Sequence, residues 1–167
     1  LLSGKMTKKS NDFLKLDKTY EAELKLGFKS STGDPEGEIV RISEKTPSKK
    51  EVEEVVRGFV GEMLQTVPKF SAVKINGQRA YKMARAGKNF ETPKRKISVY
   101  SIDILEYEYP KLRIGCEVSS GTYIRTLAED IGERLGVGAY LASLRRTKIG
   151  EYEIKNAVNL EEFCWFS

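Results

Sequence analysis

Tyr123 and Arg125 are the residues best placed to do chemistry, because they stand where a helix is predicted to begin, in the segment GTYIRTLAEDIGERLG. Unpaired backbone N–H groups in the first turn of a helix attract anions, so an arginine and a tyrosine there suit a binding or catalytic site. In a plainer interpretation, Arg125 forms an exposed ion pair with Glu129 one turn later, worth about 0.3–0.5 kcal/mol. Spacing alone favours the plainer interpretation.

The residue types available for catalysis are restricted, because the chain contains no histidine. The commonest general base, the usual partner of a serine or cysteine nucleophile and the commonest metal ligand are therefore missing. The two cysteines, Cys116 and Cys164, are far apart and show no CxxC spacing, so neither a disulfide framework nor a thiolate zinc site is indicated. Any chemistry must use carboxylate, tyrosine, lysine or arginine side chains.

A basic stretch runs from Lys69 to Lys96. It holds nine basic residues and one acid, a net charge of +8, whereas the whole chain carries +5. Phe70, Tyr81 and Phe90 lie among these cations. Cations attract phosphates and aromatic rings offer surfaces on which bases stack, so the stretch favours nucleic acid as a partner over a merely solvated face.

Other candidate segments have plain structural explanations when they are judged by residue type alone. The loop STGDPEG holds two carboxylates, but its Gly, Asp and Pro residues form turns and it is too short to bind calcium, so a surface turn is predicted. Leu144 beside Arg145 and Arg146 predicts a core leucine with solvated cations. Tyr20 fits one more apolar position on a strand.

The elements that would position these residues follow from periodicity. Ser48 and Glu51 form a capping box that begins a helix, and Asn76-Gly77 predicts a hairpin turn. Ser120 or Thr122 would cap the helix that carries Arg125. Strands are predicted at 18–27, 97–109, 112–118 and 149–154, and helices at 7–16, 48–63, 78–87, 119–136 and 139–144.

This order predicts one α+β domain with a mixed, largely antiparallel sheet flanked by helices, because no regular βαβ alternation occurs. The length of 167 residues, with 40% hydrophobic and 32% charged residues, fits one globular domain. The sequence shows no apolar run of membrane-spanning length and no signal peptide pattern, so a cytoplasmic location is expected.

Several motifs in one order resemble the TruB family of tRNA pseudouridine synthases, and together they cover nearly the whole chain. GTYIRTLAEDIG is the most specific of them. The motifs are KMTK at 5–8, DKTYEAELKLG at 17–27, STGDPEG at 31–37, QTVPKFSAVKINGQRAYKMARAG at 65–87, CEVSSGTYIRTLAEDIGERLG at 116–136 and LRRTKIG at 144–150.

The resemblance implies an isomerase that converts a T-loop uridine of tRNA, at position 55, to pseudouridine without a cofactor or metal. The target base must leave its stack, which requires a pocket with a stacking ring and apolar walls. The implied partner is the T-arm of tRNA, bound by a monomer.

The resemblance also implies roles for individual residues. Tyr20 matches the family's base-stacking tyrosine and candidate proton acceptor, and Tyr123 and Leu144 match substrate-pocket positions. Arg125 matches the arginine that pairs with the catalytic aspartate, which would keep that carboxylate ionised and oriented. Lys8 matches a lysine with a structural or RNA-contact role. The insert at about 68–96 matches the element that grips the T-arm, with candidate RNA contacts at Lys74, Arg79, Lys82, Arg85 and Lys88.

Two family features are expected to lie outside this sequence. The GxLDPxAxG motif, which carries the catalytic aspartate, would precede Leu1, and Asp17, Asp34 and Asp130 match other family positions. The C-terminal PUA domain of bacterial members would follow Phe166. The sequence therefore predicts a partial catalytic domain that needs the missing N-terminal segment and is inactive alone.

Three alternatives remain beside the enzyme. The runner-up is a catalytically silent RNA-binding fragment or truncated homologue, from which the presence of an upstream GxLDP segment would distinguish the enzyme. Guide-dependent archaeal and eukaryotic relatives are disfavoured, because they resemble this family without the basic insert. A basic ribosome-associated protein would leave the GTYIR motif unexplained.

Overall fold

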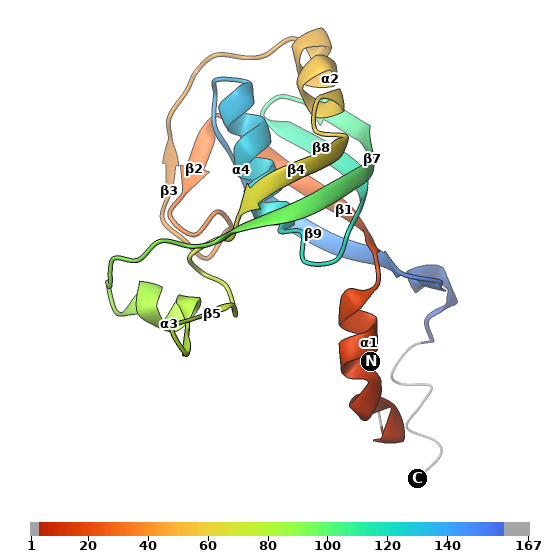
Figure 1. Ribbon diagram of the computed structural model, residues 1–167. Helices are drawn as coiled ribbons and strands as arrows, with labels where there is room; N and C mark the ends of the chain where they lie inside the picture. The colour runs from red at the N-terminus through yellow and green to blue at the C-terminus, as the bar shows by residue number, and fades with distance from the viewer. Residues whose placement is uncertain (1–3, 159–167) are drawn as a thin grey trace.

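A six-stranded antiparallel sheet forms the centre of the computed structural model, which describes residues 4–158 (Figure 1). Its strand order is β10-β9-β1-β8-β7-β4. The strands are β1 (Lys18–Leu26), β4 (Gly61–Thr66), β7 (Lys94–Glu108), β8 (Lys111–Val118), β9 (Ala139–Ile149) and β10 (Tyr152–Glu153). The predicted α+β class with an antiparallel sheet is confirmed.

Strand β1 is central because its sequence alternates as a half-buried strand requires. Ala22, Leu24 and Leu26 are buried on one face, and the residues between them are partly or fully exposed. β1 pairs with β8 on one side and β9 on the other, so residues distant in sequence come together along it. β8 alternates in the same way and adds Leu112, Ile114, Cys116 and Val118 to the core.

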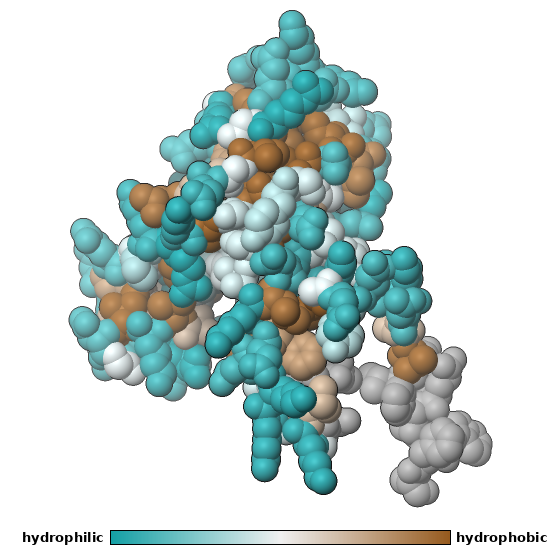
Figure 2. All heavy atoms as spheres, turned by 45° about the vertical axis from the view of Figure 1, so that its right-hand side comes forward, coloured by the Kyte–Doolittle hydropathy of each residue, from teal (hydrophilic) through white to brown (hydrophobic). Residues whose placement is uncertain are grey.

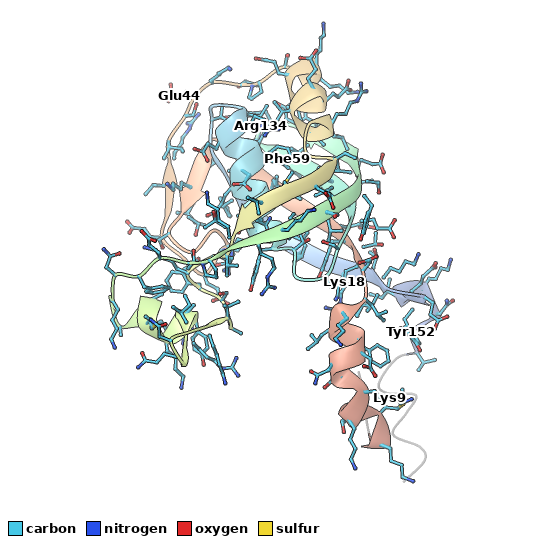
Figure 3. All side chains as sticks on the ribbon, in the orientation of Figure 1. Lys9, Lys18, Glu44, Phe59, Arg134 and Tyr152 are labelled. Atoms are coloured by element: carbon cyan, nitrogen blue, oxygen red, sulfur yellow. The ribbon has the colours of Figure 1, made fainter. Side chains whose placement is uncertain are left out.

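Helices α2 (Lys49–Arg57) and α4 (Ile124–Arg134) add their buried side chains to the same core. The predicted capping box begins α2, since Ser48 and Glu51 each accept a hydrogen bond from the other's backbone N–H. The two helices are tied near their C-terminal ends. There the Arg134 guanidinium lies 4.3 Å from the Phe59 ring centroid and donates to the Gly58 carbonyl (Figure 3).

Two projections extend from the sheet apart from each other, one at the lower left and one at the lower right of the view (Figure 1). One is the basic insert between β4 and β7, with the hairpin β5 (Lys74–Ile75) and β6 (Gln78–Arg79) and helix α3 (Ala80–Arg85). Asn76 and Gly77 both have positive φ, 49° and 81°, as an Asn-Gly hairpin turn requires. The other projection, the N-terminal arm, is a 3₁₀ turn at Gly4–Lys9 followed by α1 (Ser10–Lys15).

A smaller hairpin of β2 (Phe28–Ser30) and β3 (Ile39–Arg41) presents the 31–37 loop near β9 and α4. The Leu141 backbone N–H donates to the Gly33 carbonyl and fixes the loop at the start of β9. Among residues 4–158, no helix is both long and apolar enough to cross a membrane.

Several local predictions were wrong. The strand predicted over 149–154 is interrupted by a turn at 150–151, so β9 ends at Ile149 and β10 covers only Tyr152–Glu153. The helix predicted over 48–63 ends at Arg57, and its last residues form β4 instead, because the chain turns at Gly58 and at Gly61, which has a φ of 122°. Residues 139–144 begin the long strand β9, because pairing with β1 outweighs their local helical preference. In the described chain α4 has no side-chain cap, since Tyr123 is its N-cap residue and the Thr122 hydroxyl donates to Ser119.

Candidate active site and RNA-facing surface

Tyr20 and Tyr123 line one pocket of about 460 Å³, although they are about a hundred positions apart in the sequence. Tyr20 reaches it from β1, and Tyr123 from the residue before α4. The loop at 119–122 and the end of α1 complete the walls. The two tyrosines lie close together, as their predicted role in stacking an extruded base requires.

Four cations line the same pocket, and residue-type reasoning assigned none of them to it. They come from separate elements: Lys15 from α1, Lys18 from β1, Arg95 from β7 and Arg146 from β9. Within the described residues, no carboxylate lines the pocket. Aromatic rings surrounded by uncompensated positive charge suit a nucleotide and its phosphates.

Sheet register explains how two of these cations reach the pocket. Arg146 is the cross-strand partner of Tyr20, so both side chains lie on one face of the sheet. Arg95 lies against Gly121, which has a φ of 82°. A Cβ atom at Gly121 would come within 2.6 Å of an Arg95 guanidinium nitrogen, so glycine lets the arginine lie close to the loop.

Lys18 joins the N-terminal arm to this pocket (Figure 3). Its ammonium group donates to the carbonyls of Leu14 and Leu16, at 2.7 and 2.5 Å, and so satisfies the C-terminal end of α1. Burial lowers the pKa of Lys18, and the neighbouring positive charge of Arg146 lowers it further. The hydrogen bonds fix the direction of the arm relative to β1.

Arg125 has a different partner from the one that helical spacing predicts. Its guanidinium donates to the Asp34 carboxylate and, at 2.6 Å, to the Phe70 carbonyl, so the predicted pairing with Glu129 is wrong. Asp34 is itself held by the Thr32 hydroxyl at 2.6 Å. The turn predicted for STGDPEG is present, with most of its residues at least partly exposed, but it is more than a solvated turn because its aspartate is bound to Arg125.

Gly33 makes this pairing possible. It has a φ of 77°, and a Cβ atom there would lie 2.7 Å from the Arg125 Cγ and 2.7 Å from a Glu129 carboxylate oxygen. Any side chain at this position would push the loop away from the first turn of α4. The only sequence signal for this contact was the Gly33-Asp34 pair, and Arg125, the partner of Asp34, is 91 positions away in the sequence.

Leu144 is half exposed, at 47%, so its predicted place in the core is wrong. It pairs with Ala22 across the β1–β9 ladder, one strand repeat from Arg146 and Tyr20. In the part of the chain that the structure describes, neither Leu144 nor Arg125 lines the tyrosine pocket. Tyr20 and Tyr123 thus line the same pocket, whereas Arg125, two positions after Tyr123 in the sequence, does not line it.

The candidate RNA contacts on both projections are exposed, as an RNA-binding role requires. The insert carries aromatic rings beneath some of its cations, with Arg85 5.8 Å from the Tyr81 ring centroid and Lys69 6.0 Å from that of Phe90. Long hydrophilic side chains also extend from the N-terminal arm (Figure 2). The exposed candidates are Lys8, Lys74, Arg79, Lys82, Arg85 and Lys88.

A larger cavity, of about 670 Å³, has the wrong charge for a phosphate ligand. The α4 carboxylates Glu129, Asp130 and Glu133 line it, with Lys29 and Lys69 as the cations. Burial raises the pKa of Glu129 and of Asp130. The smaller, cationic pocket is therefore the better candidate for RNA, and size alone does not identify the site.

Comparison with known proteins gives a consistent result along the chain. Residues 1–124 match the model of the TruB family pseudouridylate synthase N-terminal domain, and residues 125–165 match that of the tRNA pseudouridylate synthase B C-terminal domain. The chain is 46% identical to tRNA pseudouridine synthase B of Cupriavidus taiwanensis, over 97% of this chain and 52% of that protein. It is 43% identical to the protein of that name in Borreliella afzelii, over 93% and 56%. The chain thus spans about half the length of these curated relatives.

Solved structures share the fold. A chain in the crystal structure of a Cbf5-Nop10-Gar1 complex is 28% identical, with a TM-score of 0.62 over 87% of this chain and 34% of that one. A chain in an H/ACA RNP bound to a substrate RNA containing 2'-deoxyuridine has a TM-score of 0.64 at 24% identity, over 93% and 36%. The second likeness concerns the fold alone.

Proposed function

Because the chain belongs to the TruB family of pseudouridylate synthases, we propose that its parent protein isomerises uridine 55 in the T-loop of tRNA to pseudouridine. The observation that carries this proposal is the cationic pocket between Tyr20 and Tyr123, which lies beside the paired Arg125. A flipped nucleotide would place its base between the two rings. Lys18, Arg95 and Arg146 would neutralise the phosphates on either side of it.

Arg125 would orient the nucleophile. A guanidinium has five N–H donors, and the hydrogen bonds to Asp34 and Phe70 occupy two of them. The remaining donors can hold a second carboxylate, ionised and aimed at the sugar or the base. Asp34 is already bound within its own loop, so we expect the nucleophile to come from the family's GxLDPxAxG motif, which this sequence does not contain.

Tyr20 would act as the stacking ring and late proton acceptor. Its position on β1, packed at the edge of the hydrophobic core, holds the ring in place against the pocket. Leu144, half exposed on the neighbouring strand, would supply an apolar wall when RNA covers it. The enzyme would need no metal or cofactor, because bond breaking, base rotation and rejoining use protein side chains alone.

The insert and the N-terminal arm, the two projections from the sheet, would hold the T-arm stem between them (Figure 1). Both present exposed cations, and the insert adds aromatic rings. Such contacts bind the RNA backbone whatever its sequence and weaken steeply as salt rises.

The deciding experiment incubates a T-arm stem-loop with this 167-residue chain, alone and supplied with a family segment that carries GxLDPxAxG. We expect salt-dependent RNA binding by both forms, and pseudouridine only from the supplemented form. Product from the chain alone would show that its own residues include the nucleophile. RNA binding without product from either form would favour a catalytically silent RNA-binding protein.

A further inference from the structure

Gln65 is a buried amide whose bonding pattern points at the active site. It lies near the end of β4, with 2% of its surface exposed. Its side-chain amide donates to the Tyr123 carbonyl at 3.0 Å and accepts from the Tyr123 backbone N–H at 2.8 Å. The two residues are 58 positions apart, so this pair joins β4 to the N-terminus of α4 across the fold.

The Tyr123 backbone needs such a partner. Tyr123 is the N-cap residue of α4, and within residues 4–158 that helix begins without a side-chain cap. A backbone N–H at this position has no partner inside its own helix. Gln65 satisfies it and also donates to the carbonyl of the same residue.

The loop before α4 is held at both ends. At its start, Ser119 exchanges two hydrogen bonds with Ser98 of β7, at 2.8 and 2.9 Å. At its end, the Gln65 pair holds the Tyr123 backbone. Two residues later, the Arg125 guanidinium is bound to Asp34 and to the Phe70 carbonyl. Gly121 lies between these anchors with a positive φ. Loss of the Gln65 pair would therefore loosen the Tyr123 backbone, which lies between the Ser119 anchor and the Arg125 contacts.

The register of the sheet also links Gln65 to the pocket. Gln65 pairs with Arg95 across the β4–β7 ladder, so the two side chains share one face, and Arg95 lines the tyrosine pocket. A few residues further along the chain, the Phe70 carbonyl accepts from Arg125. The segment from Gln65 to Phe70 therefore contacts the start of α4 at two points: Gln65 binds the Tyr123 backbone, and the Phe70 carbonyl accepts from Arg125.

We propose that Gln65 is a positioning residue of the proposed synthase. It fixes the backbone of Tyr123 so that the tyrosine ring faces the pocket and the Arg125 guanidinium, one half-turn later, faces Asp34. Gln65 contacts neither RNA nor the reacting atoms, and it acts through Tyr123. The inference rests on the proposed function, because positioning has a catalytic consequence only if this site forms pseudouridine.

The test compares Gln65→Met, which keeps the length and loses both hydrogen bonds, with Val56→Ala in the buried face of α2. Both are made in the full-length protein, meaning this chain joined to the family segment that carries GxLDPxAxG. Hydrogen exchange measured by mass spectrometry should speed up across residues 119–127 in Gln65→Met and stay as in wild type in Val56→Ala. Single-turnover product formation at saturating stem-loop should fall roughly 100-fold in Gln65→Met, since a displacement of about 1 Å costs that much. The dissociation constant of the stem-loop should change less than about threefold, because the cations that bind phosphate are elsewhere.

Each other outcome overturns the inference. Wild-type exchange at 119–127 would show that Gln65 does not hold the turn. A rate equal to that of Val56→Ala, at a matched loss of thermal stability, would show a merely structural role. A loss confined to RNA affinity would make Gln65 part of the binding surface. If the wild-type protein itself formed no product, the proposed function would fail, and the exchange measurement would still decide whether Gln65 fixes Tyr123.

Discussion

Replacing Asp34 by asparagine tests whether the 31–37 loop belongs to the active site. The change keeps the shape and removes the charge that faces Arg125, whose side chain is 17% exposed against 23% for Asp34. A hydrogen bond to a charged group contributes about 1.5–3 kcal/mol, and partial exposure places this one near the lower end. We therefore expect a loss of about 1–2 kcal/mol in the free energy of unfolding, which corresponds to a fall of roughly 2–8 °C in Tm for a domain of this size.

The effect on catalysis should be larger than the effect on binding. If Arg125 loses a partner, its guanidinium no longer points in one direction, and each 1.36 kcal/mol of lost transition-state stabilisation costs about tenfold in rate. We expect single-turnover pseudouridine formation by the full-length protein to fall about 10- to 100-fold, with little change in stem-loop affinity. Glu36→Gln is the matched control, because it removes one charge from the same loop at an exposed position. Equal rates for Asp34→Asn and the control would refute the argument.

Three further predictions use other parts of the molecule. Lys82→Ala and Arg85→Ala should each weaken stem-loop binding and reduce the slope of log affinity against log salt concentration by about one. The control Lys49→Ala, on α2, should change neither. An unchanged slope would exclude these insert cations as phosphate contacts. Burial raises the pKa of the Cys116 thiol to about 12, so native protein at pH 8 should react slowly with iodoacetamide at this residue and rapidly once unfolded; rapid labelling of native protein would contradict its burial. Burial also raises the pKa of Glu129 above its ordinary value, so the protonated carboxyl group stabilises the native state and this stabilisation is lost as pH rises through the native pKa. Glu129→Gln should therefore raise Tm at pH 7 and change it little at pH 4. The opposite trend would show that Arg125 outweighs burial.

Local patterns predicted the elements that are stabilised locally. The capping box at Ser48, the alternation of β1 and β8 and the Asn76-Gly77 turn all depend on residues within a few positions of one another, and all three are confirmed. The helix predicted at 139–144 was wrong because strand β9 forms by pairing with β1, more than a hundred positions earlier. Composition carries no record of such a partner, so local helical preference decided the prediction wrongly.

The same limit applied to the candidate site. Tyr123 and Arg125 were identified by their place at a helix start, but the partners that fix them, Gln65 and Asp34, come from strands and loops elsewhere in the sequence. The pocket cations were equally hidden. Lys18, Arg95 and Arg146 come from three strands that the sheet order brings together, and Lys15 comes from helix α1.

The division of charge between two sides of α4 gives a physical reason why RNA would be directed to one of them. The α4 helix begins beside the cationic tyrosine pocket, whereas its outer face, with Glu129, Asp130 and Glu133, lines the acidic cavity. A phosphate chain would be attracted to the first and repelled from the second, and both effects act along the same short helix. Arg125 lies at the boundary, where Asp34 neutralises it on one side. A second carboxylate could bind Arg125 beside Asp34 because the nearby cations of the pocket would offset the added negative charge.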